Sequence, residues 1–338
     1  MFSVSANPAN GKRPTANSHL MKAIEYTQYG SSDVLHLIES EKPFPKDDEV
    51  LIKVSAASIN PLDWRIMKGK PYAVRIMFGL TKPRHTRPGR DVAGQVETVG
   101  RNVTQIKPGD AVFGACRGSL AEFACARESH LAIKPPNVTF EQAASVPVAA
   151  LTALQCLRDK GKIQAGQKVL VDGAGGGVGT FAVQIAKSFG VEVTAVCSTG
   201  NMDVMRSIGA DQVIDYTKED FTQRGQRYDL IVAPNGYHSI SDYQRVLGPG
   251  GIFVMAGGGM GLAFKLMLLG SWISMIGGKK MTSMLARIRR EDLNFIGELM
   301  ESGKVKPVID RLYPLSETAD AIRYLEAGHA RGKVVITV

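Results

Sequence analysis

Residues 168–198 read KVLVDGAGGGVGTFAVQIAKSFGVEVTAVCS, and this stretch decides the fold. Residues 169–171 form a short β-branched and aliphatic run that is typical of a buried parallel strand. Glycines dominate residues 172–179 and predict a turn. Apolar residues then recur on one helical face over 181–189, and residues 191–196 return to a strand. The stretch therefore predicts a strand–turn–helix–strand unit.

The glycines of this turn are spaced Gly173-x-x-Gly176-x-x-Gly179, with Val178 where the commoner G-x-G-x-x-G pattern has its last glycine. A strand that runs through glycines into a helix presents free backbone N–H groups and a positive dipole end, which bind a pyrophosphate. A tight turn without a ligand is the alternative. The complete β-α-β unit around the motif favours a dinucleotide site.

The end of the second strand bears on the choice of cofactor. NAD enzymes place an acid there to hold the ribose 2′-hydroxyl, whereas this chain has small polar residues at 197–201 and no acid before Asp203. Arg206 follows one turn later and suits a 2′-phosphate, although a solvated helix residue is the alternative. The sequence favours NADPH over NADH.

Length and composition limit the function classes. The chain has 338 residues, which suits two domains, and a formal net charge of +9. No basic run is interleaved with aromatic residues, so we predict no nucleic-acid site. The four cysteines are Cys116, Cys125, Cys156 and Cys197. They are scattered and form no C-x-x-C pair, which argues against a disulfide framework and against a thiolate zinc knot.

Residues 1–20 are rich in Ser, Asn, Pro and Ala and contain no acid. They lack the apolar core of a secretory signal. We expect a disordered N-terminal extension, or a working start at Met21, and a cytoplasmic protein. An organelle transit peptide is the alternative.

The rest of the chain divides by pattern. Residues 21–146 alternate short β segments with turns, which predicts a mostly β, barrel-like first part of the catalytic domain. Residues 147–288 alternate strands and helices, which predicts a doubly wound parallel sheet. Residues 289–338 hold two amphipathic helices and a last strand that we expect to rejoin the first sheet. The expected fold is α/β, with the cofactor domain inserted in the other domain.

The stretch 252–278 carries a single charge, Lys265. Glycines at 257–259 and this lysine interrupt it, so we predict no transmembrane span. A buried core or subunit interface is the leading interpretation. Weak peripheral membrane contact and an apolar substrate lid stay open. We expect a homodimer.

Five motifs in order along the chain resemble the medium-chain dehydrogenase/reductase superfamily, and most of all its zinc-free quinone oxidoreductase and enone reductase branch. They are Asn60-Pro61-x-Asp63, GDAVFG at 109–114, GAGGGVG at 173–179, GADQVIDY at 209–216 and GKVV at 332–335. The resemblance implies a Rossmann-type sheet inserted in a GroES-like catalytic domain. The resemblance covers the chain from Met21 to the C-terminus.

The zinc-binding members of this superfamily carry a cysteine near the position of 60–63 and a Gly-His-Glu where this chain has Gly89-Arg90-Asp91. Neither the thiol nor the imidazole is present. A lone His85 beside basic residues does not replace them, because a tetrahedral site needs three or four ligands. We therefore predict no metal.

Without zinc, an alcohol substrate loses the Lewis acid that would ionise it. The resemblance then implies an NADPH-dependent reductase that transfers hydride to a quinone or an α,β-unsaturated carbonyl. Two alternatives stay open: a zinc-free alcohol or ketone dehydrogenase, and a non-catalytic, NADPH-binding structural or regulatory protein.

The resemblance implies four catalytic positions. Asn60 would lie beside the nicotinamide and the substrate, with Asp63 nearby; an Asn-Pro turn with Asp63 capping the next helix is the alternative. Thr152 would contact the nicotinamide, unless it is a plain helix residue. Tyr72 lies near the tyrosine that donates a proton in related enoyl reductases, and solvent is the other proton source.

The resemblance also implies the cofactor contacts, which run from the pyrophosphate turn through the adenosine side to the nicotinamide side. They are Gly173, Gly176, Gly177, Val178, Ser198, Asn201, Arg206, Tyr216, Asn235, Gly257, Thr152 and Lys333. For Lys333, a charge flanking the last strand is the alternative.

Overall fold

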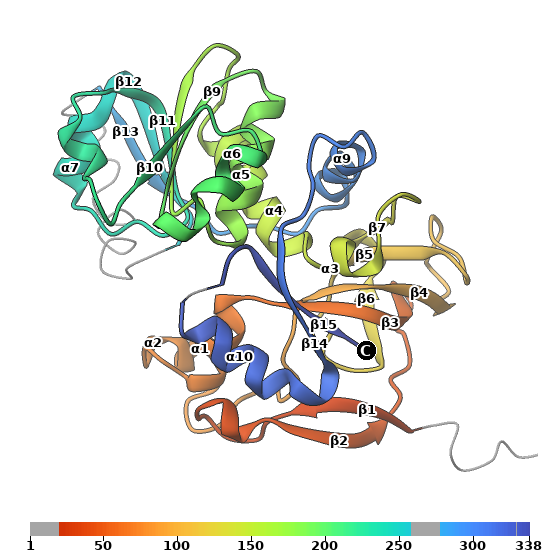
Figure 1. Ribbon diagram of the computed structural model, residues 1–338. Coiled ribbons are helices and arrows are strands. Elements are labelled where there is room, and N and C mark those ends of the chain that lie inside the picture. Colours follow the sequence, from red (N-terminus) through yellow and green to blue (C-terminus); the bar gives the residue numbers. More distant parts are fainter. Residues whose placement is uncertain (1–19, 258–277, 329) are drawn as a thin grey trace, which may run out of the picture.

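The computed structural model describes residues 20–257, 278–328 and 330–338. The expectations for residues 1–19, and for most of the apolar stretch 252–278, lie outside the described residues. The chain folds into two lobes (Figure 1), and the C-terminal strands β14 (Ile309–Pro314) and β15 (Lys333–Thr337) return to the sheet of the first lobe, so the second lobe is inserted in it. No helix in the described ranges is long and apolar enough to cross a membrane.

The first lobe is built on a seven-stranded sheet in the order β14-β15-β3-β4-β5-β7, with β6 paired to β3. Its neighbours are antiparallel, except that β14 and β15 run parallel. An antiparallel pair, β1 (Leu20–Glu25) and β2 (His36–Glu41), lies beside it. The bounds of the sheet strands are β3 (Glu49–Ile59), β4 (Asp91–Val99), β5 (Ala111–Ala115), β6 (Phe123–Arg127), β7 (Leu131–Ile133), β14 (Ile309–Pro314) and β15 (Lys333–Thr337).

The second lobe is a six-stranded parallel sheet in the order β10-β9-β8-β11-β12-β13. Its strands are β8 (Lys168–Asp172), β9 (Glu192–Cys197), β10 (Gln212–Asp215), β11 (Tyr228–Ala233), β12 (Leu247–Met255) and β13 (Lys280–Ser283). The strand order reverses between β8 and β11. In open α/β sheets, ligands bind beyond the carboxyl ends of the strands at such a point. The predicted α/β class, with a doubly wound parallel sheet and a mostly β second unit, is confirmed.

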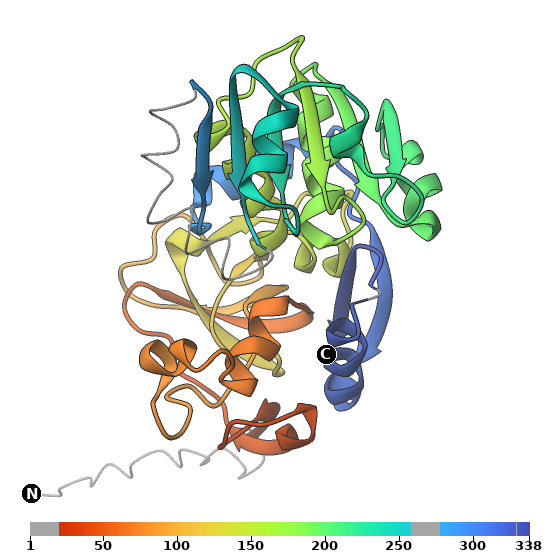
Figure 2. The same ribbon diagram turned by 90° about the vertical axis from the view of Figure 1, so that its left-hand side faces the viewer.

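The α-helices cover the sheets and join the lobes (Figures 1 and 2). Their bounds are α1 (Pro61–Lys68), α2 (Ala73–Phe78), α3 (Phe140–Ala144), α4 (Pro147–Leu154), α5 (Gly177–Ser188), α6 (Met202–Ser207), α7 (Ile240–Val246), α9 (Arg290–Glu301) and α10 (Thr318–Glu326). α4 continues directly into a π-helical segment, Gln155–Lys160.

One continuous core fixes the lobes against each other. Buried side chains of the first sheet, such as Phe113, belong to the same cluster as Leu151 of α4 and Phe181 of α5. The last strand brings the chain back to the first sheet, because β15 pairs with β3 with Val334 opposite Ile59. The segment just before β15 contacts the glycine turn that follows β8, so residues far apart in the sequence meet where the two lobes face each other.

Candidate active site

The glycine turn between β8 and α5 has the backbone that its sequence predicts. Gly173 has φ +94°, which side chains rarely adopt. A Cβ on Gly179 would lie 2.3 Å from the Gly173 carbonyl oxygen, so α5 can start this close to the turn only with glycine there. At Gly176 an added Cβ would meet one atom alone, Gly173 O at 3.9 Å. Among the described residues, that face of the turn is open.

The segment before β15 lies directly on this turn. The backbone N–H of Gly332 donates to Gly175 O at 3.0 Å, and Gly176 forms an isolated β-bridge with Gly332. The side chain of Lys333 passes Gly177, whose added Cβ would be 2.8 Å from Lys333 Cδ. Lys333 therefore lies against the glycine turn and is not an exposed charge at the end of a strand.

The Lys333 ammonium is buried among polar partners from the first lobe. Its Nζ donates to Asn60 Oδ1 at 2.7 Å and to Ile59 O at 3.2 Å. It also pairs with Asp91 Oδ2 at 3.2 Å. The exposed fractions are 3% for Lys333 and 0% for Asp91. A buried charge needs such partners, because desolvation would otherwise disfavour the ionised form.

Asp91 accepts three further hydrogen bonds besides its contact with Lys333. Its Oδ2 accepts from Ser58 Oγ and from Asn60 Nδ2, both at 2.8 Å. Its Oδ1 accepts the N–H of Val148 at 2.9 Å, in the first turn of α4. Sequence reasoning treated Asp91 only at a lost zinc position and missed this role. The sequence does hold a signal for this role, because Asp91 stands directly before a run of apolar residues that is typical of a buried strand.

The cluster fixes the orientation of the Asn60 amide. Lys333 donates to Oδ1 and Asp91 accepts one hydrogen from Nδ2. An amide nitrogen carries two hydrogens, so one donor is left over from the bonds within this cluster. Asn60 is the residue before α1 and is buried, next to the glycine turn through Lys333. The geometry offers an oriented N–H donor where the two lobes meet.

Asp63 lies beneath Asn60 in the first turn of α1. Its Oδ2 accepts the backbone N–H of Asn60 at 2.8 Å, so the capping interaction considered for this pair is present. Burial raises the pKa of Asp63 to about 6; the Asn60 hydrogen bond opposes the shift, and the Asp91 charge adds to it. Both the small exposed fraction and the pKa shift describe a carboxyl group held away from water.

Asp63→Asn is expected to change how stability depends on pH. The folded-state pKa, about 6, lies above the ordinary 3.8, so ionising Asp63 opposes folding as pH rises through this window. The variant lacks this effect and keeps an acceptor for Asn60. Its free energy of unfolding relative to the wild type should rise between about pH 4 and pH 7 by up to about 3 kcal/mol. Urea unfolding at both pH values measures it, with exposed Glu39→Gln as control. A pH-independent difference would contradict the account.

The other two predicted catalytic residues are placed differently. The Thr152 hydroxyl is buried and donates within α4 to Val148 O at 2.6 Å. Tyr72, just before α2, is 69% exposed, and the Arg75 guanidinium lies 5.0 Å from its ring centre. Within the described residues, no hydrogen bond joins Tyr72 to Asn60 or Lys333. Both catalytic roles stay predictions.

The predicted adenosine-side residues gather beyond β9. Asn201 Nδ2 donates to Ser198 Oγ at 3.0 Å, while Asn201 Oδ1 is buried without a hydrogen-bond partner among the described residues. The same amide lies against Gly175 of the turn. Tyr216 is 60% exposed, and its backbone N–H donates to Cys197 O at 3.0 Å. An unsatisfied buried oxygen beside the glycine turn is the kind of group that a ligand completes.

Arg206, the predicted 2′-phosphate residue, forms an exposed ion pair with Asp203 at 2.8 Å. Another guanidinium occupies the end of β9 instead. Arg331 Nη2 would lie 3.0 Å from a Cβ added to Gly200. Sequence reasoning missed Arg331. Two features of the sequence could have indicated Arg331. Gly200 has no side chain at the end of β9, which leaves room for another residue, and Arg331 stands directly before Gly332.

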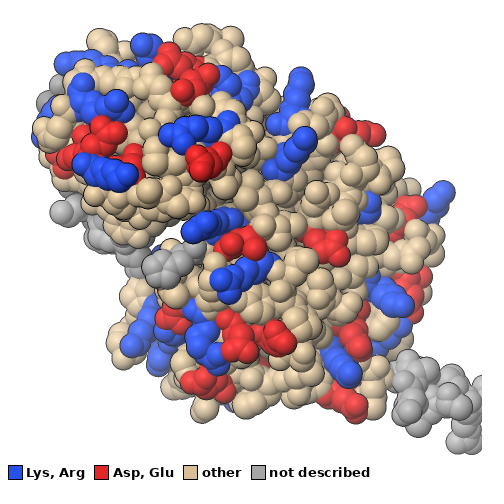
Figure 3. All heavy atoms as spheres, in the orientation of Figure 1, with Lys and Arg blue, Asp and Glu red and all other residues tan. Residues whose placement is uncertain are grey.

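The remaining predicted contacts lie at the carboxyl ends of the strands. Asn235 follows β11, and its Cβ lies beside Gly173. Gly257 follows β12, where an added Cβ would be 2.4 Å from Pro234 O. Val178 is half-buried in the first turn of α5. Figure 3 shows a hollow between the two lobes on this side, with Lys and Arg side chains at its border.

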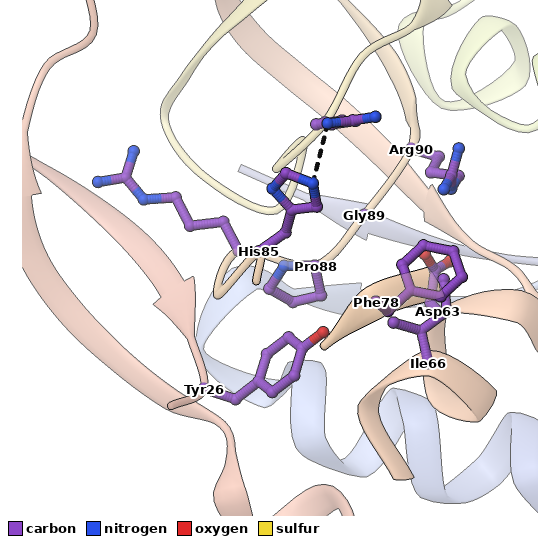
Figure 4. A pocket seen from close by; sticks show the side chains of 10 residues that line it. Tyr26, Asp63, Ile66, Phe78, His85, Pro88, Gly89 and Arg90 are labelled. Atoms are coloured by element: carbon purple, nitrogen blue, oxygen red, sulfur yellow. Dashed lines mark hydrogen bonds between the residues drawn. The ribbon is translucent and has the colours of Figure 1, made fainter. Parts of the chain in front are cut away.

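A pocket opens in the first lobe next to Asp63. Figure 4 shows Tyr26, Asp63, Phe78 and His85 around it, and Arg90 also lines it. His85 Nε2 lies 2.9 Å from Arg117 Nη1 and therefore accepts, and burial and the nearby guanidiniums lower the pKa of His85. The described residues contain no group of three or more His, Cys, Asp or Glu side chains placed to hold a metal ion.

Comparison with known proteins identifies two family models. The Alcohol dehydrogenase GroES-like domain matches residues 46–153, and a Zinc-binding dehydrogenase model matches residues 208–336. The chain is 38% identical to 2-methylene-furan-3-one reductase of Solanum lycopersicum, over 94% of this chain and 79% of that protein. It is 37% identical, with the same coverage, to the chloroplastic NADPH-dependent alkenal/one oxidoreductase of Arabidopsis thaliana.

A solved structure has the same fold. The quinone oxidoreductase from Coxiella burnetii superposes with a TM-score of 0.82 at 30% identity, and the alignment covers 94% of this chain and 99% of that one.

Proposed function

The chain belongs to the medium-chain dehydrogenase/reductase superfamily, in the branch of the quinone and alkenal/one oxidoreductases, and from this premise we propose that it is a zinc-independent, NADPH-dependent reductase of α,β-unsaturated carbonyls or quinones. It is an oxidoreductase by its relatives. The observation that carries the proposal is the buried Lys333–Asn60–Asp91 cluster, which lies on the glycine turn and directs an amide donor into the junction of the lobes.

The residues present fit a dinucleotide. The open face at Gly176 leaves room for a pyrophosphate at the N-terminus of α5. Asn201 Oδ1, which has no hydrogen-bond partner in the described part of the chain, would face the adenosine side. When bound, NADPH supplies a hydride. The acceptor needs a hydrogen-bond donor for the negative charge that develops on its carbonyl oxygen. The remaining N–H of Asn60 is our candidate for that donor.

Each neighbour of Asn60 has a part in this proposal. Lys333 holds the amide oxygen, so the amide cannot turn its acceptor toward the substrate. Asp91 accepts one amide hydrogen and ties α4, which carries Thr152, to the same cluster. The ion pair with Lys333 also engages Asp91, the one carboxylate of the Gly89-Arg90-Asp91 segment, so this carboxylate is not free to bind a metal. We therefore propose reduction without a metal.

Preference for NADPH rests on Arg331 rather than Arg206 in this proposal. A guanidinium binds a 2′-phosphate through charge-assisted hydrogen bonds, and Arg331 has no ion-pair partner among the described residues. The cytoplasmic location and the homodimer remain predictions from the sequence.

Arg331→Gln should raise the Kd for NADPH at least about tenfold and leave the Kd for NADH unchanged, because only NADPH carries the 2′-phosphate. Fluorescence titration with both coenzymes measures this. Arg206→Gln is the matched control, since its guanidinium is engaged by Asp203, and should change neither constant by much. Equal loss of both coenzymes in Arg331→Gln would assign Arg331 to fold or pyrophosphate binding instead.

The reaction class is tested by steady-state oxidation of NADPH against a short enone, a benzoquinone, a ketone and, in the reverse direction with NADP, an alcohol. We expect turnover of the enone or the quinone. Turnover of the ketone and alcohol alone would make the protein a zinc-free alcohol dehydrogenase. Binding of NADPH without turnover of any acceptor would make it a cofactor-binding protein.

A further inference from the structure

Between Asp63 and Asp91 the chain has no acidic residue. The segment is basic throughout: Arg65, Lys68, Lys70, Arg75, Lys82, Arg84, Arg87 and Arg90 all lie in it, together with His85. It comprises most of α1, all of α2 and the loop that leads into β4. Lys68 is paired with Glu326 of α10, and the other cations of the segment have no acid of their own segment to pair with. Surfaces of ordinary soluble proteins mix both signs of charge, so the remaining cations favour an anionic partner.

Four large apolar side chains project into solvent in the middle of this segment. The exposed fractions are 69% for Tyr72, 69% for Ile76, 71% for Met77 and 69% for Leu80. Tyr72 and Ile76 are four residues apart at α2 and so share a face, and Leu80 follows the helix. We call these four residues the α2 patch. Figures 1 and 2 both place α2 at the margin of the first lobe.

The exposed cations around the α2 patch are available for a partner. Lys70, Lys82 and Arg84 are exposed and have no ion-pair partner among the described residues. Arg75 is held against the protein instead, because it stacks on the rings of Tyr29 and Tyr72 and its Nε donates to Gly69 O at 3.1 Å. Clustered apolar side chains with a cationic border are the pattern of a protein that lies on an anionic membrane surface.

We propose that the α2 patch docks on an anionic phospholipid surface. Ile76, Met77 and Leu80 enter the boundary between head groups and acyl chains, and Lys70, Lys82 and Arg84 contact the phosphates. The six residues of α2 are too few to span a bilayer, so the contact is peripheral. A second copy of this chain fits poorly as occupant, because the same three unpaired cations would face each other.

The location of the patch relates the docking to the proposed function, on which this last step rests. The patch follows α1, whose N-terminal residue is preceded by Asn60, and Phe78 of α2 lines the pocket that also contains Asp63 and Arg90. Apolar quinones and long-chain enones partition into membranes. A docked patch would bring the junction of the lobes to the surface that holds these substrates.

The test is sedimentation of the full chain with vesicles, without substrate. Vesicles of phosphatidylcholine alone are compared with vesicles that also contain phosphatidylglycerol. We expect binding to the anionic vesicles, loss of that binding at high salt, and little binding to phosphatidylcholine. Ile76→Ser/Met77→Ser should weaken binding at least about tenfold. Lys82→Gln/Arg84→Gln should weaken it about fivefold for each cation removed.

Two controls separate the patch from general effects. Leu285→Ser removes an apolar side chain that is 86% exposed in another part of the chain, and Lys53→Gln removes an exposed cation outside the segment. Both should bind like the wild type, and every variant should reduce a water-soluble enone at the wild-type rate. That assay, without vesicles, reports failure of the proposed function separately from failure of docking.

Three results would overturn the proposal. If the protein binds phosphatidylcholine vesicles as well as anionic vesicles, the cations of the segment do not contribute to docking. Equal weakening by the control variants excludes the α2 patch. Self-association that the patch variants abolish, without vesicle binding by the wild type, makes a second copy the occupant.

Discussion

Lys333→Met is expected to lower the free energy of unfolding by about 3–5 kcal/mol, because it leaves the Asp91 carboxylate buried without its counter-charge. Methionine matches the length of the lysine stem, so lost packing contributes little. The three hydrogen bonds that Asp91 accepts from Ser58, Asn60 and Val148 remain and set the loss toward the lower end. The variant also frees the Asn60 amide oxygen, so we expect reduced turnover with the NADPH affinity less affected.

Urea unfolding measures the stability, and a double variant identifies the cause. Lys333→Met/Asp91→Asn has neither charge and keeps an acceptor on residue 91, so it should be more stable than Lys333→Met alone. Lys53→Met, at an exposed position in β3, serves as the control and should stay within about 0.5 kcal/mol of the wild type. A double variant less stable than the single one would show that the two residues do not act as a pair.

Gly176→Ala is expected to have the second large effect, which is a loss of affinity for the cofactor with little change in the stability of the fold. Among the described residues, an added methyl group would meet only Gly173 O at 3.9 Å, an ordinary contact. Gly176 has φ −86°, which alanine adopts freely. The folded protein therefore tolerates the methyl group. A pyrophosphate bound close to the turn would clash with the methyl group, so the Kd for NADPH should rise at least about tenfold.

Alanine substitutions at two further glycines serve as controls for Gly176→Ala. Gly248→Ala adds a methyl group in β12 with a nearest contact of 3.5 Å, so stability and cofactor affinity should both stay near the wild type. Gly179→Ala places the Cβ 2.3 Å from a carbonyl oxygen and should destabilise the turn itself. If Gly176→Ala binds NADPH like the wild type, the open face of the turn is not the pyrophosphate site.

The sequence predicted the parts of the fold that depend on local pattern. The glycine spacing at 173–179, the β-branched run before it and the apolar face after it depend on near neighbours, and the structure has β8, the turn and α5 there. The final strand was also predicted, since a β-branched run needs no distant partner to be recognised. Its pairing with β3 explains why the C-terminus reaches the site.

The candidate site was predicted less completely, because it is made by contacts between distant segments. Asn60 and Lys333 were identified through resemblance, but their hydrogen bond joins residues 273 positions apart, and spacing could not reveal it. Asp91 was missed for the same reason. Arg206 was chosen because it is one turn from β9 in sequence, whereas Arg331 lies against Gly200 from the other end of the chain.

The most direct test of hydride transfer to a carbon–carbon double bond uses NADPH with deuterium at both C4 positions and a short enone, followed by NMR of the product. Our account predicts deuterium on the β-carbon of a saturated ketone, and much slower formation of this product by Asn60→Ala, which lacks the amide donor. Deuterium on the carbonyl carbon of an alcohol would contradict it, and so would the absence of any transfer to the enone together with no reduction of a benzoquinone.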